Sequence, residues 1–300
     1  MKRVIITFIT LLIGGIAFSL SAQSWKAKHV VLIGLDGWGS YSVEKANMPH
    51  VKNLMENGCY TLKKRSVLPS SSAPNWASMF MGAGTELHGY THWGSKTPEL
   101  PSRELNKNGI FPTIFSLLKE NHPESEIGCI FEWDGIKYLI DTLSVDYVKH
   151  VAEYNERPMA IVEYASEYIK EFRPNLLSII IDEPDHVGHV EGHDTPAYYA
   201  KMNELDGYVG RIIQAIRDAG IWEETILIVT SDHGGIEKNH GGIKMEEMEA
   251  PFIIAGKNIR RTKEFSESMM QFDVAATIAS IFNLEQPQVW IGRSMDQVFE

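Results

Sequence analysis

The sequence predicts an α/β fold of three layers, in which helices cover both faces of a central, mostly parallel sheet. Short apolar runs rich in β-branched residues alternate with amphipathic stretches along most of the chain, which is the pattern of such a sheet. The chain has 300 residues and is 44% hydrophobic, enough to bury the core of one large domain. No linker or shift in composition divides it, so we expect a single domain over residues 24–300.

The clearest strands are predicted at residues 29–35, 176–181, 225–230 and 251–255, and weaker ones at 61–67 and 127–131. The four clearest are short apolar runs, as expected for buried strands. Apolar residues recur at helical spacing between Leu205 and Ile216, and Gly220 follows where a helix C-cap would stand. Further helices are predicted at 111–120, 159–172 and 272–282.

Residues 1–23 predict a secretory signal peptide. Lys2 and Arg3 precede an apolar run that two glycines interrupt, and small residues stand before Gln23. This run is short for a helix that spans a membrane. We therefore expect a periplasmic or secreted protein with no permanent membrane span, and a membrane anchor is the alternative.

Composition argues against several classes of protein. Cys59 and Cys129 are the only cysteines, so a disulfide-rich scaffold and a metal site built from cysteines are excluded, while a pairing of these two stays open. The formal net charge of −11 disfavours a nucleic-acid polymer as partner. A small nucleotide remains compatible with this charge, because bound metal cations reverse the sign locally.

Three of the predicted strands are followed by residue types that bind metals. Asp36 follows the first strand, in the run HVVLIGLDGWG. The runs IIIDEPDHVGH and TILIVTSDHGG carry Asp185 with His189 and Asp232 with His233. An Asp alone at such a place is usually a helix cap or turn former. Asp and His together at three strand ends, where parallel sheets form their binding crevices, indicate one metal or catalytic site.

In this order, the motifs resemble those of the alkaline phosphatase superfamily, and within it the type I phosphodiesterases and nucleotide pyrophosphatases. The resemblance runs from LIGLDGWGSYSVEKANMPHVKNLMENG through PSSSAPNWASMFMGAGTELHG to IDEPDHVGH, SDHGG and KNHGG. It continues in the closing segment QFDVAATIASIFNLEQPQVWIGRSM. The resemblance implies an alkaline phosphatase-like fold and a metal-dependent hydrolase of phosphate esters.

The resemblance also implies two divalent metal ions, most typically Zn²⁺, with Mn²⁺ or Mg²⁺ as alternatives. The implied ligand sets are Asp185, His189 and His240 for one ion, and Asp36, Asp232 and His233 for the other. Three nitrogen and oxygen ligands leave an open coordination position, as a catalytic zinc requires. Two ions about 3.5–4 Å apart can stabilise both the attacking and the leaving oxygen of a displacement.

Ser72 matches the family's nucleophile, which also touches the second metal. The run SAPNWASMFMGA indicates a helix start, with Ser72 near the N-cap and Pro74 in the first turn. The helix dipole and free N–H groups there favour an alkoxide and a bound phosphate oxygen. Ser71 is the alternative nucleophile, and simple capping is the alternative role of Ser72. We expect a phospho-Ser72 intermediate.

The substrate contacts are less defined by the sequence. The family's phosphodiesterase branch carries an Asn soon after the His-Gly of TELHG, where this chain has Trp93. Asn75, His92 and Lys96 are therefore the candidates for contacting a phosphoryl oxygen, and Trp93 is expected to lie near the substrate. His193 is expected at the surface.

The expected substrate is a small phosphate ester, either a nucleotide or a lipid-headgroup phosphodiester. A phosphomonoesterase of the same fold is the main alternative. A sulfatase is another, but Ser72-Ala73-Pro74-Asn75-Trp76 has the Pro of the sulfatase signature without its Arg. The signal peptide disfavours a phosphomutase. Six candidate metal ligands with a hydroxyl disfavour a binding protein that has lost the chemistry.

Overall fold

The structure, a computed structural model, describes residues 25–154 and 156–300, so the predicted signal peptide lies outside the described residues. The described chain forms an eight-stranded sheet in the order β4-β3-β5-β1-β6-β7-β2-β8. The strands are β1 (His29–Leu35), β2 (Cys59–Arg65), β3 (Ile127–Phe131), β4 (Tyr147–His150), β5 (Leu176–Ile181), β6 (Thr225–Thr230), β7 (Glu249–Gly256) and β8 (Lys263–Glu264). Within these described ranges, no helix combines the length and apolar character needed to cross a bilayer.

Strand direction agrees with the predicted fold class. Among the described strands, β7 runs antiparallel to its neighbours β6 and β2, and the other pairings are parallel. The central strand β1 is buried along its whole length and pairs Gly34 with Ile180 of β5 and with Thr230 of β6. The carboxyl ends of these three strands therefore lie side by side at one edge of the sheet.

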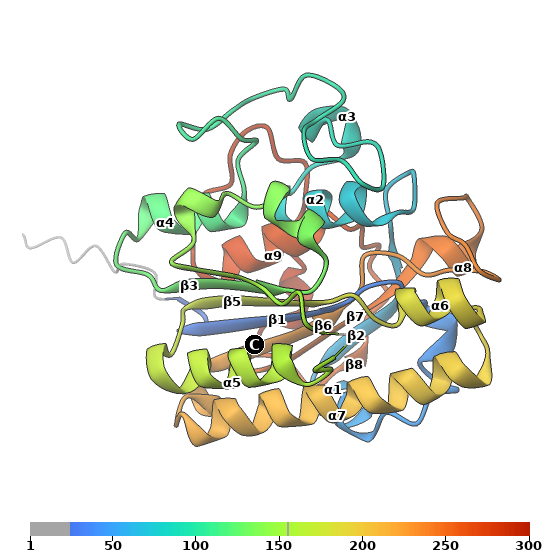
Figure 1. The fold of residues 1–300 in the computed structure, drawn as a ribbon. Coiled ribbons are helices and arrows are strands. Elements are labelled where there is room, and N and C mark those ends of the chain that lie inside the picture. The colour runs from blue at the N-terminus through green and yellow to red at the C-terminus, as the bar shows by residue number, and fades with distance from the viewer. Residues whose placement is uncertain (1–24, 155) are drawn as a thin grey trace, which may run out of the picture.

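Helices cover both faces of the sheet, which confirms the predicted three-layer α/β/α fold (Figure 1). The helices are α1 (Pro49–Glu56), α2 (Ser72–Met81), α3 (Thr85–His88), α4 (Ile114–Asn121), α5 (Ala160–Phe172), α6 (Asp185–Glu191), α7 (Pro196–Asp218), α8 (Met245–Met248) and α9 (Asp273–Ile281). Figure 1 shows α2, α4 and α9 on one face and α1, α5 and α7 on the other. Two buried hydrophobic clusters, one on each side, join these layers to the sheet.

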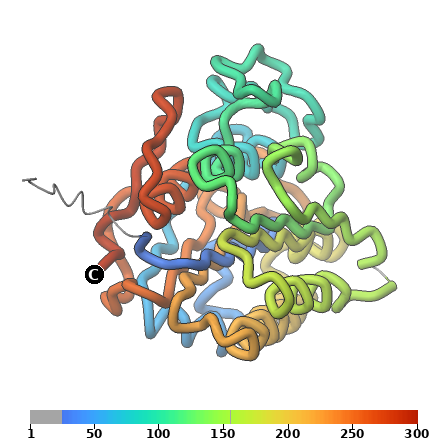
Figure 2. Tube along the Cα trace, turned by 90° about the vertical axis from the view of Figure 1, so that its left-hand side faces the viewer, coloured from blue at the N-terminus to red at the C-terminus, as the bar shows by residue number. Residues whose placement is uncertain are grey.

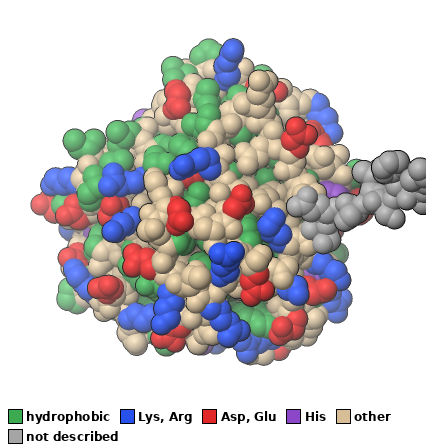
Figure 3. Space-filling model, turned by 180° about the vertical axis from the view of Figure 1, so that it is seen from behind, with side chains coloured by type: hydrophobic (Ala, Val, Ile, Leu, Met, Phe, Trp, Pro, Cys, Tyr) green, Lys and Arg blue, Asp and Glu red, His purple; other side chains and the backbone are tan. Residues whose placement is uncertain are grey.

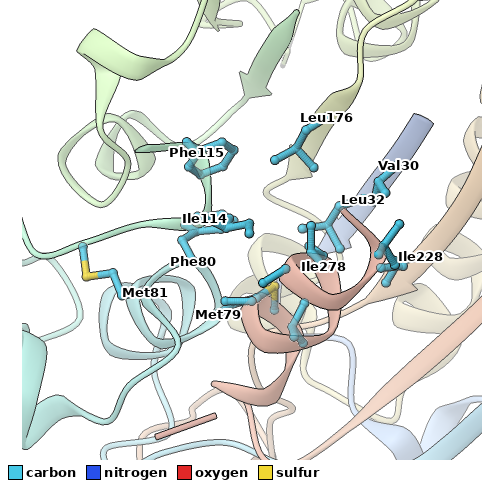
Figure 4. Close-up of a cluster of buried hydrophobic side chains, with 14 of the residues drawn as sticks. Val30, Leu32, Met79, Phe80, Met81, Ile114, Phe115, Leu176, Ile228 and Ile278 are labelled. Carbon is cyan, nitrogen blue, oxygen red and sulfur yellow. The ribbon is translucent and has the colours of Figure 1, made fainter. Parts of the chain in front are cut away.

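The cluster under α2 fixes the helix that begins with the candidate nucleophile. Figure 4 shows Phe80 of α2, Phe115 of α4 and Ile278 of α9 gathered against Val30 and Leu32 of β1. All five side chains are buried, and burying each such side chain contributes about 1.5–3 kcal/mol. This packing holds α2 against the sheet as a rigid support for its N-terminus.

Several helix boundaries differ from the predicted ones for identifiable reasons. α4 begins at Ile114 rather than at 111, because Thr113 caps it by accepting a hydrogen bond from the backbone N–H of Ser116 at 3.1 Å. α7 begins as early as Pro196, where the Thr195 hydroxyl accepts from Tyr198 N. Helices α1 and α6 and the edge strands β4 and β8 are not predicted by the sequence patterns.

The last described residues pack beside the first ones. Figure 2 shows the C-terminus next to the segment that leads into β1, where Lys26 Nζ lies 5.0 Å from the centre of the Phe299 ring. Asn258 also donates a hydrogen bond to Lys26 O at 2.6 Å.

On the molecular face shown in Figure 3, acidic and basic side chains are interspersed. Cys59 and Cys129 are buried free thiols.

Gly34 tests how tightly the centre of the sheet packs on α2. A Cβ at this position would lie 2.3 Å from Trp76 Cη2 and 2.9 Å from Ile180 Cδ1. We expect Gly34→Ala to lower the free energy of unfolding by about 1–3 kcal/mol, as overpacking does, measured by urea denaturation. Gly207→Ala is the control, because no atom lies within 4 Å of its added Cβ. That change in α7 should stabilise by about 0.5–1 kcal/mol, and a Gly34→Ala variant as stable as the wild type would contradict the packing.

Candidate metal and catalytic site

Three buried aspartates meet at the edge where β5, β1 and β6 end. Asp36 follows β1 directly, Asp185 begins α6 after β5, and Asp232 stands two residues after β6. Their exposed fractions are 2%, 8% and 0%. Gly37 turns the chain after Asp36 with φ +68°, and a Cβ there would lie 2.5 Å from Asp185 Oδ1. This glycine lets the ends of β1 and β5 approach each other.

The first group of potential metal ligands is Asp185, His189 and His240. Helix α6 places Asp185 and His189 one turn apart, so that His189 Nε2 lies 3.1 Å from Asp185 Oδ2. His240 comes from the loop after β6, and its Nε2 lies 3.6 Å from the same oxygen and 3.2 Å from His189 Nε2. The structure thus brings together the three residues that the resemblance assigns to one ion.

The second group is centred on His233, which is fully buried. Asp36, Asp185 and His233 have ligand atoms within 4.8 Å of one another, and His233 Nε2 lies 3.5 Å from Asp36 Oδ1. Asp232 Oδ2 lies 3.2 Å from that nitrogen. The implied partners Asp36 and Asp232 therefore both face His233, and Asp185 lies between the two groups.

Each of the three histidines has its ring oriented by a backbone carbonyl. The Nδ1 atoms of His189, His233 and His240 lie 2.9 Å from Lys238 O, 2.8 Å from Gly234 O and 3.1 Å from Ser70 O. Because a carbonyl only accepts hydrogen bonds, each Nδ1 carries a proton and each Nε2 faces the carboxylates. Metal-binding histidines are held in this way.

The electrostatics of the site favour cation binding. Asp36 Oδ1, Asp185 Oδ1 and Asp232 Oδ2 are buried without a hydrogen-bond partner among the described residues, which is costly for a charged oxygen. Burial and the charge of Asp232 raise the pKa of Asp36 well above its usual range. Burial and the charge of Asp185 raise the pKa of Asp232 to about 7.

His233 adds a second argument for a cation. Burial lowers the pKa of His233 well below its usual range, so its ring is neutral and its Nε2 lone pair points at Asp232 Oδ2, another acceptor. The hydrogen bond to Asp185 instead raises the pKa of His189 to about 9, so a metal ion would compete with a proton for that nitrogen. Carboxylate oxygens and imidazole nitrogens are a donor set that fits Zn²⁺.

Ser72 is the first residue of α2, and Ser71 is its N-cap. No side-chain hydrogen bond caps this helix, so capping does not occupy the Ser72 hydroxyl. Its Oγ lies 3.3 Å from His233 Nε2. Ser70 Oγ instead donates to Gly242 O at 2.7 Å, and Ser71 is buried with 4% exposure. Of the three serines, Ser72 is the one whose hydroxyl contacts the candidate metal ligands.

Two buried side chains that the sequence analysis does not identify support these aspartates. Trp76 Nε1 donates a hydrogen bond to Asp36 Oδ2 at 2.8 Å. Lys64 is fully buried and donates to Ser231 O at 2.5 Å and to the side chain of Gln271. Burial lowers the pKa of Lys64 to about 7. The sequence offers no signal for Lys64, because a lysine in a strand normally points to solvent.

A cavity of about 590 Å³ opens beside the metal ligands and is lined by Ser72, His189 and His240. His92 and Trp93 also line it, and Trp93 is 58% exposed. Other lining residues that bear on the chemistry are Trp133, Asp182, Asp185 and His186. Burial and the charge of Asp185 raise the pKa of Asp182 to about 7. Among the described residues, neither Lys nor Arg lines this cavity.

Three expectations need correction. Asn75 is not placed to contact a substrate, because it is buried, its side-chain oxygen accepts from Val67 N at 2.7 Å, and its amide donates to backbone carbonyls. It stabilises the loop before α2 instead. Lys96 lies 5.6 Å from the Tyr138 ring and does not line the cavity. His193 is not at the surface, since its side chain is fully buried beside Asp185.

Comparison with known proteins gives the site a context. The family model described as type I phosphodiesterase / nucleotide pyrophosphatase matches residues 30–253. Ectonucleotide pyrophosphatase/phosphodiesterase family member 1 of Rattus norvegicus is 27% identical over 227 residues, covering 70% of this chain and 24% of the relative. A bis(5'-adenosyl)-triphosphatase of Mus musculus is 24% identical, covering 69% and 47%. The chain thus spans less than half the length of these curated relatives.

Solved structures show a similar fold. Murine ectonucleotide pyrophosphatase/phosphodiesterase 5, as an inactive form in complex with AMP, has a TM-score of 0.70 and 18% identity, covering 87% of this chain and 96% of that one. A 2-O GAG sulfatase has a TM-score of 0.74 and 15% identity, covering 91% and 74%. At these identities the likeness concerns the fold alone, which phosphodiesterases and sulfatases share.

Replacing Asp232 tests cation binding, because the change should affect the thermal stability of the metal-free and the zinc-loaded protein in opposite directions. Removing its charge with Asp232→Asn should raise the melting temperature of the chelated protein, because one buried, uncompensated carboxylate is lost. The same change should reduce the stabilisation gained on adding Zn²⁺, which for an intact site is about 2.7 kcal/mol at 100 times the dissociation constant. Thermal unfolding with and without Zn²⁺ measures both effects.

The matched control is Asp141→Asn. Asp141 is also buried, but its carboxylate accepts hydrogen bonds from Asn106, Asn108 and Leu143. Its replacement should destabilise the protein equally with and without Zn²⁺. An unchanged zinc effect in Asp232→Asn would contradict a metal site at this aspartate.

Proposed function

Because the chain belongs to the type I phosphodiesterase / nucleotide pyrophosphatase family, we propose that it hydrolyses small phosphodiesters with the Ser72 hydroxyl as nucleophile. One observation carries this proposal. The Ser72 Oγ lies 3.3 Å from His233 Nε2, at a helix N-terminus that borders both the candidate metal ligands and the cavity. A hydroxyl in this position is accessible to a substrate and free of capping.

The candidate ligands fit two divalent ions. Asp185, His189 and His240 would hold one ion, and Asp36, Asp232 and His233 would hold the other. Such ions would lower the pKa of a hydroxyl or water and neutralise negative charge that develops on the phosphate. Zn²⁺ is the proposed metal, since nitrogen and carboxylate ligands suit it.

Two displacements account for the proposed reaction. In the first, Ser72 Oγ forms a bond to phosphorus, the bond to the leaving oxygen breaks, and the hydroxyl proton passes through solvent to that oxygen, so that an alcohol departs. In the second, water attacks the phospho-Ser72 ester, and Ser72 leaves with a proton. The positive end of the α2 dipole stabilises negative charge on the serine and phosphate oxygens. Two in-line displacements retain the configuration at phosphorus.

The charges around the cavity favour a diester over a monoester. A monoester carries two negative charges, and Asp182 adds a carboxylate to the cavity wall. Arg65, the nearest Arg to Ser72 in the sequence, does not line the cavity and pairs with Glu249 at 3.3 Å. The sulfatase reaction is disfavoured because Trp76 occupies the place of the signature Arg and is buried against Asp36.

Trp93 and Trp133 offer aromatic surfaces in the cavity, which suit a nucleobase or another flat leaving group. The relatives named for bis(5'-adenosyl)-triphosphate hydrolysis and for an AMP complex support a nucleotide substrate. A lipid-headgroup phosphodiester is the alternative substrate. The N-terminal pattern and the ecto-enzyme names of the relatives support export from the cytoplasm.

The nucleophile is tested with Ser72→Ala. We expect turnover to fall by more than about 10³-fold, because the attacking oxygen is removed, while metal analysis finds both ions still bound. Ser71→Ala is the control and should retain most of the activity. Full activity in Ser72→Ala would refute the covalent route through Ser72. If only Ser71→Ala lost activity, Ser71 would be the nucleophile instead.

The substrate class is tested with four p-nitrophenyl compounds on the zinc-loaded enzyme. We expect bis-p-nitrophenyl phosphate and p-nitrophenyl thymidine monophosphate to be hydrolysed with a higher kcat/KM than p-nitrophenyl phosphate, because the dianion is repelled by the cavity carboxylate. p-Nitrophenyl sulfate should be the poorest substrate. A preference for the monoester or for the sulfate would replace the proposal with a phosphomonoesterase or a sulfatase.

A further inference from the structure

His193 is a buried histidine in a space that two glycines create. It stands two residues after the end of α6, its side chain has no exposed surface, and its ring lies 5.4 Å from that of Tyr198. A Cβ on Gly188 or on Gly235 would lie 2.4 Å or 2.2 Å from the ring nitrogen Nε2. Gly188 lies between the candidate ligands of α6, and Gly235 follows those of the β6 loop. The two segments that carry these candidate ligands therefore both pack against the His193 ring.

The ring of His193 faces the oxygen of Asp185 that the candidate metal ligands leave free. His193 Nε2 lies 3.6 Å from Asp185 Oδ1, and within the described residues both atoms are buried without another hydrogen-bond partner. The second oxygen, Oδ2, faces His189 and His240. Asp185 thus has one oxygen beside His193 and the other beside the two candidate ligand histidines.

His193 also attaches the loop that carries His240 to helix α6. Its backbone N–H donates to Glu237 O at 2.6 Å, and its Nδ1 lies 3.2 Å from the same oxygen. The next carbonyl, of Lys238, is the one that orients His189. Glu237 has a φ of +52°, a conformation that a non-glycine residue adopts only when neighbours hold it. His193 is one of these neighbours.

We propose that His193 is a positioning residue of the metal centre. Its Nε2–H donates to Asp185 Oδ1, because a carboxylate is a stronger acceptor than Glu237 O, which already accepts the backbone N–H of His193. This bond directs Oδ2 toward His189 and His240. Partners that orient a ligand from behind typically change metal affinity by about 10–100-fold. This role rests on the metal site of the proposed function, and none of the motifs in the sequence assigns it.

Two substitutions separate the contact with Asp185 from the volume of the ring. The amide nitrogen of Gln reaches about as far as Nε2 of His, whereas that of Asn reaches only as far as Nδ1. We expect His193→Asn to weaken the binding of one of two zinc ions by about 10–100-fold, and His193→Gln to bind both within about threefold of wild type. Competition with a chelator, starting from metal-free protein, measures each dissociation constant.

His88→Gln is the control for losing a buried imidazole. His88 is fully buried, and its Nε2 lies 2.9 Å from Ser78 Oγ, in a position that does not line the cavity. This variant should melt at a lower temperature and keep its zinc affinity. If His193→Asn is too unstable to purify, Gly188→Ala takes its place, because the added Cβ displaces the His193 ring.

The outcomes are distinct. Wild-type affinity in both His193 variants would overturn the proposal. Equal loss in both variants would also overturn it, because the ring would then act by packing alone rather than through a donor at Nε2. A wild-type protein that takes up no zinc would overturn the proposed function itself, and this role with it. The proposal is supported if His193→Asn loses zinc affinity while His193→Gln and His88→Gln keep it.

Discussion

The repulsion among four carboxylates at one edge of the sheet is the constraint to which the rest of the site responds. Asp36, Asp182, Asp185 and Asp232 gather where buried strands end, and burial combined with their mutual charge raises the pKa of all except Asp185. Burial alone would raise that of Asp185 too, but hydrogen bonds from its three neighbouring histidines hold it well below its usual range. Donors converge from behind on the remaining oxygens, as Trp76 does on Asp36. Among the described residues, Asp36 Oδ1 and Asp232 Oδ2 have no hydrogen-bond partner, and both face Nε2 of the candidate ligand His233.

The same parallel topology explains why much of the fold is predictable from sequence. Buried strands such as β5 and β6 are continuous apolar runs, and their bounds agree with prediction to the residue. The pattern weakens at the sheet edges, where β4 is only partly buried, so this strand gives no apolar run. The sequence pattern also does not predict helix α6. Its sequence DHVGHVE is polar and contains a helix-disfavouring glycine, because its residues serve the site rather than the core.

Some residues of the candidate site can likewise be predicted from the sequence, and others cannot. Its aspartates and histidines are predictable because they follow strands that the sheet brings together. Side chains that support them from behind are not, since their contacts depend on how loops return to the sheet. Lys64 is an example, being a charged residue that strand periodicity alone would place in solvent. Asn75 illustrates the opposite error, in which the sequence predicts a site residue that the structure does not place in the site. It is polar and close to Ser72, but the unpaired backbone groups of the preceding loop engage its amide completely.

Charge balance connects the constraint at the strand ends with substrate choice. In the proposed centre, two divalent ions would carry four positive charges against the four carboxylates, so the loaded site would be close to neutral. A phosphodiester brings one negative charge into such a site, whereas a monoester brings two. Enzymes that hold a dianion commonly add a guanidinium, which binds phosphate in a bidentate manner. Here the residue in the equivalent stretch is Trp76, whose indole N–H is already committed to Asp36. The side chain that orients a candidate metal ligand thus also excludes a cation from the start of α2, so the proposed preference for diesters follows from how the aspartates are stabilised.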